Sequence, residues 1–201
     1  MSDHWIVRSV LCAALAAAAL AMLANLLTSL SVGEPLPDLV TAINNGDDPA
    51  VAATLGESSE EWMAMTGWLM ATEAELSLNG CRTNLDASTT CQVHFGPAWF
   101  FNRAAPPEVA AAGSFATSIT GRAIGDQFMI IDWPLPAALR TVDRPFRLWA
   151  MQIHPDEAAV MWEPLHLGRG VSTTMRIDKA SGQARSDLLD EYLAFRNPPT
   201  T

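Results

Sequence analysis

Two side chains in this sequence, His94 and Asp132, are of the types that transfer protons in acid–base catalysis. His94 lies in an alternating segment on the face opposite Cys91 and Val93, which directs it toward solvent or a partner. Asp132 ends an apolar segment directly before a Trp-Pro pair, where a turn residue is also expected. Both are candidate catalytic residues, and each has this simpler structural explanation.

Other catalytic and ligand-binding motifs are missing from the sequence. It contains no glycine-rich phosphate loop, no HExxH or CxxC motif and no nucleophile elbow. Cys81 and Cys91 have no further cysteine or histidine at the spacing of metal ligands. We therefore expect neither a metal site nor a cofactor.

The same two cysteines favour a disulfide. Cys81 and Cys91 lie on consecutive predicted strands, and strand pairing centred on Asp86 places them opposite one another. Directly opposed positions are within reach of a disulfide, and such a bond persists only in an oxidising compartment. The alternative is a pair of buried free thiols.

Aromatic residues are candidates for two kinds of binding surface. The chain has seven tryptophans, of which four are candidates to line an apolar ligand pocket, with core packing as the alternative: Trp62, Trp68, Trp133 and Trp149. A run before a Pro-Pro pair is a candidate exposed contact patch for a partner: Trp99, Phe100 and Phe101.

Hydrophobic periodicity predicts helices at both ends of the soluble part and strands between them. We expect helices over residues 38–45, 48–55, 58–72, 143–153 and 156–162, followed by a final helix that carries Tyr192. Strand alternation marks residues 75–78, 89–95, 115–120 and 128–131. Asp143 is expected to cap its helix, and a loop of about 20 residues around Gly168 and Gly182 to precede the last one. This order predicts an α+β fold.

The N-terminal segment predicts a membrane anchor. Residues 9–32 carry no charge, and roughly two dozen helical residues span the hydrocarbon core of a bilayer. Arg8 precedes this segment and acidic residues follow it, so residues 1–8 are expected in the cytoplasm and residues 33–201 outside it. The formal net charge of -10 and the lack of a basic patch argue against nucleic-acid binding.

Small residues recur along this predicted span. Ala13, Ala17 and Ala21 lie four residues apart, and such a smooth face lets another membrane helix approach closely. The alternative is a generic alanine-rich span. A second alternative is a signal peptide, which would release a secreted domain lacking its first 31 residues.

The element order resembles that of a known superfamily. The carrying features are the short N-terminal helices, the hairpin of residues 76–81 and 89–93, the strands at 115–119 and 128–131, and the segment 144–155. Over residues 36–195 these features are similar to the nuclear-transport-factor-like superfamily, also called SnoaL-like or ketosteroid-isomerase-like, including actinobacterial members. The resemblance implies a curved antiparallel sheet wrapped by helices into a cone around a pocket. Members of this superfamily serve as isomerases, cyclases, dehydratases, ligand binders and scaffolds.

Isomerase members pair an acidic base with a tyrosine. The single tyrosine, Tyr192, lies in the predicted C-terminal helix rather than the sheet. We therefore expect a non-catalytic accessory or scaffolding subunit of an envelope complex, single-pass in the cell membrane and bound to other membrane proteins. The alternatives are an enzyme or carrier for an apolar small molecule in the cone, with Asp132 or His94 as base, and the secreted ligand-binding protein.

Overall fold

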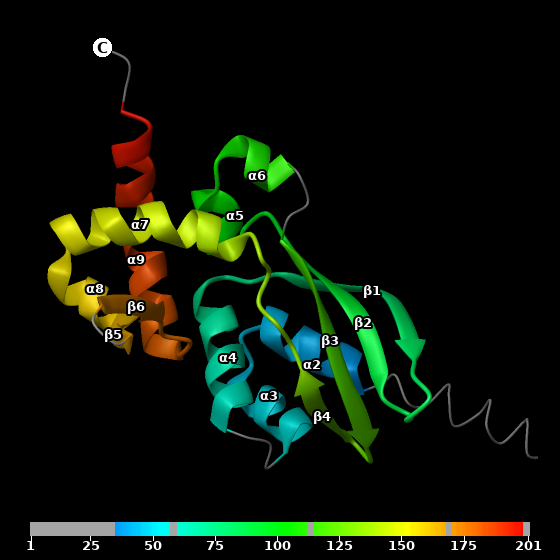
Figure 1. The fold of residues 1–201 in the computed structure, drawn as a ribbon. Coiled ribbons are helices and arrows are strands. Elements are labelled where there is room, and N and C mark those ends of the chain that lie inside the picture. The colour runs from blue at the N-terminus through cyan, green and yellow to red at the C-terminus, as the bar shows by residue number, and fades with distance from the viewer. Residues whose placement is uncertain (1–34, 57–59, 112–114, 168–169, 199–201) are drawn as a thin grey trace, which may run out of the picture.

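The computed structural model describes residues 35–56, 60–111, 115–167 and 170–198. Three helices come first: α2 (Pro35–Asn44), α3 (Asp48–Leu55) and α4 (Glu60–Ala71). The middle of the chain holds β1 (Leu76–Thr83), β2 (Thr89–Phe95), α5 (Phe100–Ala104), α6 (Pro107–Ala111), β3 (Ala116–Ile124) and β4 (Gln127–Asp132). The last part holds α7 (Leu139–Ile153), α8 (Pro155–Met161), β5 (Trp162–Leu167), β6 (Gly170–Met175) and α9 (Lys179–Arg196). The predicted α+β fold is confirmed (Figure 1).

The predicted membrane segment lies outside the described residues, together with Ala13, Ala17 and Ala21. Within the described residues, no helix combines the length and the hydropathy that crossing a bilayer requires.

The second predicted helix is confirmed in detail by α3. The Asp47 side chain accepts a hydrogen bond from the backbone N–H of Ala50 at 3.0 Å, which caps the helix. Pro49 lies in the first turn, where its missing N–H costs nothing. Gly56, with φ of 62°, ends the helix in a conformation that favours glycine.

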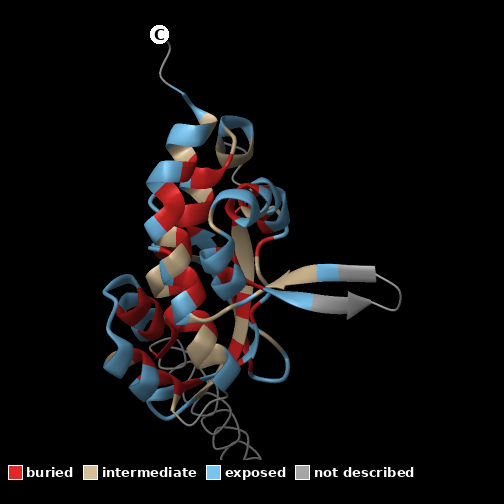
Figure 2. Ribbon diagram, turned by 90° about the vertical axis from the view of Figure 1, so that its left-hand side faces the viewer, coloured by how far each residue is buried: buried red, intermediate tan, exposed pale blue. Residues whose placement is uncertain are grey.

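Four strands form one antiparallel sheet in the order β1-β2-β3-β4. Its inner face carries Cys91, Val93, Ile119, Phe128 and Ile130, which are all buried. Helices α2 and α3 contact β1 and β4 on this side, whereas the alternate residues of β2 and β3 face outward (Figures 1 and 2). Alternation of apolar and polar residues therefore gives a sheet that is covered on one face.

The β3–β4 hairpin is longer than its sequence predicts. The predicted strands end at residue 120 and begin again at residue 128, but both strands continue to a tight turn at Gly125 and Asp126. Gly121 lies within β3, where a Cβ would come 2.4 Å from the ring of Phe128. Its role is close approach, not chain reversal.

Helix α7 begins four residues before the predicted cap, so the prediction that Asp143 caps it is wrong. Leu139, Val142 and Phe146 are all buried and recur at helical spacing, which extends the helix toward its N-terminus. Asp143 consequently lies inside the helix, with only 7% of its surface exposed. A carboxylate in that position needs partners.

The loop predicted around Gly168 and Gly182 is also wrong. A two-stranded antiparallel hairpin, β5–β6, occupies most of it and projects from the body in Figure 2. Gly182 lies within α9, where a Cβ would come 2.8 Å from that of Ala71 on α4. Glycine here lets α9 and α4 pack closely, a cause that sequence patterns do not distinguish from a turn.

The predicted exposed patch is wrong as well. Trp99, Phe100 and Phe101 are 0%, 1% and 0% exposed. The Trp99 indole donates a hydrogen bond to Thr72 Oγ1 at 3.0 Å, and its ring stacks on Phe95 with centroids 4.0 Å apart. Helix α5 contacts α7 and α9 and so brings these aromatic rings into the core.

Candidate functional site

The two candidate catalytic residues are exposed and far from one another along the sheet. His94 pairs with Ala116 on β3, whereas Asp132 on β4 pairs with Thr120. Four residues of strand correspond to about 13 Å, and the two residues also lie on strands separated by β3. The structure does not bring them together as an acid–base pair.

The four candidate pocket tryptophans pack in or against the hydrophobic core. Trp68, Trp133 and Trp149 are buried, and Trp62 is half-buried against the same core. Trp68 meets Trp99 edge-on, with ring centroids 6.3 Å apart. None of the four lines the hollow described below.

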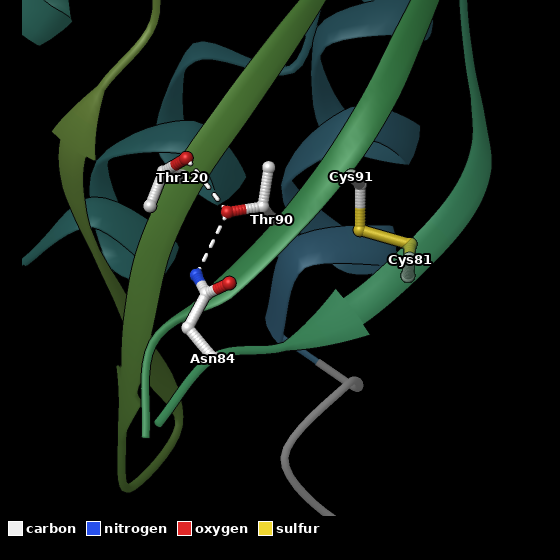
Figure 3. Close-up of a disulfide and its surroundings, with 5 residues drawn as sticks. All are labelled: Cys81, Asn84, Thr90, Cys91 and Thr120. Carbon is white, nitrogen blue, oxygen red and sulfur yellow. Dashed lines mark hydrogen bonds between the residues drawn. A yellow bond between two sulfur atoms is a disulfide. The ribbon is translucent and has the colours of Figure 1, made fainter. Parts of the chain in front are cut away.

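The predicted disulfide is confirmed, and Figure 3 shows it joining neighbouring strands. Cys81 and Cys91 have Cα atoms 4.0 Å apart. The β1–β2 register shifts between Asn79 and Arg82, around Gly80 with its φ of 56°, and pairing beyond this shift is centred on Asp86 as predicted. Closing so short a loop typically contributes roughly 2–3 kcal/mol to stability.

A hydrogen-bonded row beside the disulfide fixes the same hairpin on its outer face (Figure 3). The Asn84 side-chain amide donates to Thr90 Oγ1 at 2.9 Å, and the hydroxyls of Thr90 and Thr120 lie 2.9 Å apart. This row links the residue after β1 to β2 and β3. It is structural, since Thr90 bonds both of the other members.

The strongest candidate site is a hollow of about 910 Å³ between the N-terminal half of α7 and strand β6. Its size matches that of pockets for small ligands or peptide segments. An arm before α7, the helix itself, β6 and the segment after it supply the lining: Leu135, Pro136, Ala137, Leu139, Arg140, Asp143, Arg144, Arg147, Thr173, Thr174, Met175 and Ile177.

Three arginines of α7 line this hollow. Arg140, Arg144 and Arg147 recur at i, i+4 and i+7, so one helical face carries all of them. Arg147 donates to Thr173 Oγ1 at 2.8 Å. Arg140 and Arg144 are exposed, and neither forms an ion pair with any carboxylate of the described residues. The chain as a whole carries a net charge of -10.

The single carboxylate of the lining, Asp143, already has partners. Its two oxygens each accept from the Trp162 indole N–H at 3.1 Å, and Arg185 Nη2 lies 3.8 Å from Oδ1. Burial raises the pKa of Asp143, and the charge of Arg185 opposes this rise. Burial also lowers the pKa of Arg185 to about 10, which keeps that side chain charged at neutral pH.

Arg185 is held by the backbone as well as by its counter-charge. It is 0% exposed, donates to the carbonyl oxygens of Ser181 at 2.9 Å and Met161 at 3.1 Å, and lies 5.0 Å from the Trp162 ring centroid. The charge of Arg185 therefore balances that of Asp143, although Arg185 does not itself line the hollow. The charges of the exposed arginines remain available to a ligand.

This arrangement suits binding of an anion better than catalysis. The guanidinium groups offer fixed, planar donors for carboxylates or phosphates. The Thr173 and Thr174 hydroxyls have no neighbouring histidine or free carboxylate in the lining to act as a base. Sequence reasoning missed this site, although the spacing of the arginines in residues 140–147 signals it.

Comparison with known proteins adds no identification: no family model, no curated protein and no solved structure matches the chain.

Proposed function

We propose that this chain is a non-catalytic accessory subunit of an envelope protein complex, anchored in the cell membrane, and that its α7–β6 hollow docks another subunit. The row of arginines in that hollow, left without carboxylate partners among the described residues, carries the proposal. Unpaired arginines on an acidic domain suit recognition of an acidic surface. An enzyme with Asp132 as its base is a weaker proposal, because His94 lies far from it.

Anchoring outside the cytoplasm is part of the proposal. It is supported by the uncharged residues 9–32 and by the Cys81–Cys91 bond, which needs an oxidising environment. Membrane fractionation with thiol counting under denaturing conditions tests it. We expect the full-length chain in the membrane fraction with its two paired cysteines blocked. Intact chain in the cytosol with reduced thiols, or a mature mass lacking the first 31 residues, contradicts the anchor.

The proposal also includes the cone-shaped architecture of the nuclear-transport-factor-like superfamily for residues 36–195. Packing of α2 and α3 on one face of an antiparallel sheet supports it. The α7–β6 hollow is built from α7, β6 and the segments next to them, not from the four-stranded sheet. A scaffolding member of that superfamily is therefore free to fill the inside of its cone with side chains.

Purification of the full chain from native membranes in mild detergent tests the docking function. We expect stoichiometric co-purification of at least one subunit, and its loss when Arg140 and Arg144 are replaced by alanine. Arg82→Ala is the matched control, because Arg82 is also exposed but lies on β1. A clean monomer, or equal loss with the control, contradicts the proposed function.

A further inference from the structure

Strand β6 presents a free edge. It pairs only with β5 within the described residues, in a register that places Thr173 opposite Pro164 and Met175 opposite Trp162. Hydrogen-bonded and non-hydrogen-bonded pairs alternate along an antiparallel ladder. The position of one hydrogen bond in the ladder therefore shows which backbone groups point away from β5.

The backbone N–H of Arg176 donates a hydrogen bond to the carbonyl oxygen of Met161 at 2.9 Å, and this bond fixes the ladder. Counting back in steps of two, Thr174 is a hydrogen-bonded position, whereas Thr173 and Met175 are not. The lack of an N–H on Pro164 agrees with this assignment. The N–H and C=O groups of Thr173 and Met175 consequently point outward from the hairpin.

This outward edge lies at the hollow. Thr173 and Met175 both line it, and Arg147 approaches the Thr173 carbonyl oxygen at 3.5 Å while bonding its hydroxyl. No described group accepts from the Thr173 or Met175 N–H at this edge. Exposed backbone donors of this kind are what an added strand pairs with.

The remaining walls set the chemistry of the occupant. Arg140 and Arg144 provide two unpaired guanidinium groups, and Leu135, Leu139 and Ile177 provide an apolar surface. A ligand that matches the arginines, the apolar surface and the edge of β6 has carboxylates, apolar side chains and a backbone of alternating donors and acceptors.

We propose that the hollow takes an extended acidic peptide segment of a partner protein, which adds to the free edge of β6 while its carboxylates pair with Arg140 and Arg144. This inference rests on the proposed docking function and specifies what docks. A small anion such as phosphate uses the arginines but leaves the β6 edge and the apolar wall unmatched. The peptide uses each of them.

Binding of a synthetic peptide to the full-length protein in detergent tests the inference. The probe is a fluorescent peptide of alternating glutamate and valine, at concentrations up to about 1 mM, the range of weak complexes. Two companion peptides carry glutamine in place of glutamate, or N-methyl groups on alternate backbone amides. We expect the first peptide to bind, and each companion to bind at least tenfold more weakly.

Protein variants and amide exchange locate the peptide. Arg144→Ala is expected to weaken binding of the glutamate peptide about tenfold or more, and Arg82→Ala to leave it unchanged. Amides of Thr173 and Met175 are expected to gain protection from hydrogen exchange when the peptide is bound. These readouts separate strand addition from simple charge attraction.

Several outcomes overturn the inference. They are absence of binding, equal binding of the N-methylated peptide, unchanged exchange at β6, or competition by inorganic phosphate at concentrations equal to those of the peptide. If these occur while co-purification of a subunit still depends on Arg140 and Arg144, the peptide inference fails and the docking function stands. Peptide binding without any co-purifying subunit supports the peptide site and contradicts the docking function.

Discussion

Helix α7 carries two kinds of charged residue whose surroundings differ. Asp143 is 7% exposed and is held by Trp162 and Arg185, next to the buried ring of Phe146. Arg140 and Arg144 are exposed and have no carboxylate partner among the described residues. All three residues line the same hollow and lie on neighbouring positions of the helix.

This contrast separates charges that serve folding from charges that are available for recognition. A buried charge without partners costs several kcal/mol, so the buried Asp143 and Arg185 must match one another for the chain to fold. An exposed arginine contributes little to folding and is free to serve a ligand. Replacing the buried Asp143 should therefore reduce stability strongly, whereas replacing an exposed arginine should reduce binding and leave stability nearly unchanged.

The largest expected effect on stability is at the buried carboxylate of Asp143. Asp143→Ala leaves the buried charge of Arg185 without its carboxylate and the Trp162 N–H without its acceptor. We expect the free energy of unfolding to fall by about 3–5 kcal/mol. Denaturant unfolding of the full chain in detergent, followed by tryptophan fluorescence, measures it. A loss below about 1 kcal/mol means that the pair is not needed for folding.

A smaller loss is expected when only the hydrogen bond is removed. Trp162→Phe preserves most of the ring but deletes the N–H that Asp143 accepts from. Hydrogen bonds to charged groups contribute about 1.5–3 kcal/mol, and we expect a loss of that size. The same unfolding experiment checks it. In the Asp143→Ala background the substitution should cost clearly less, because the acceptor is already missing.

The titration of Asp143 gives a pH dependence of defined sign. Its pKa is raised in the folded state, chiefly by burial, so the folded protein holds this proton more tightly than the unfolded chain. The resulting stability is present below the usual pKa of 3.8 and is lost as pH rises through the raised value. For one proton the slope is at most about 1.4 kcal/mol per pH unit.

Comparison with Asp143→Asn isolates that slope. The variant cannot titrate at this position, so the stability of the wild type relative to it should decrease as pH rises above 3.8. Unfolding curves of both proteins at several pH values provide the measurement. A difference that stays constant, or that grows with pH, contradicts the assigned direction.

The smallest expected effect on stability is at an exposed arginine of the hollow. Arg144→Ala should change the free energy of unfolding by less than about 0.5 kcal/mol, because the side chain is exposed and makes no ion pair within the described residues. Unfolding in detergent checks this, with Asp143→Ala measured in parallel. A loss comparable to that of Asp143→Ala would show that this exposed arginine also supports folding.

Local patterns in the sequence predict much of the fold. Asp47, Pro49 and Gly56 define α3 because capping and turn chemistry act over a few residues. Cys81 and Cys91 follow from strand register, which a single turn fixes. These features need no information about distant parts of the chain.

Tertiary contacts decide the features that were predicted wrongly. In the sequence Gly182 is typical of a loop, whereas in the structure it allows α9 to lie close to Ala71 on α4. The run from Trp99 to Phe101 indicates a surface patch until α7 and α9 cover it. Asp143 indicates a cap because acidic residues favour helix starts, and only its contact with Arg185 reveals a buried charge. In each case the deciding partner is distant in sequence.

The candidate site illustrates the same limit. The arginine spacing on α7 is visible in the sequence, but β6 lies in a segment predicted as loop, so the opposing wall could not be predicted. His94 and Asp132 are catalytic candidates by residue type alone. Their separation across the sheet shows that residue type without register does not define a site.

The position of α2 has a consequence for the proposed membrane anchor. In Figure 1, α2 lies beside the four-stranded sheet, whereas α7, α8 and the β5–β6 hairpin lie on the left of the picture. If the proposed tether enters through α2, its point of entry and the arginine-lined hollow belong to different parts of the fold. A partner bound in the hollow then does not have to displace the tether.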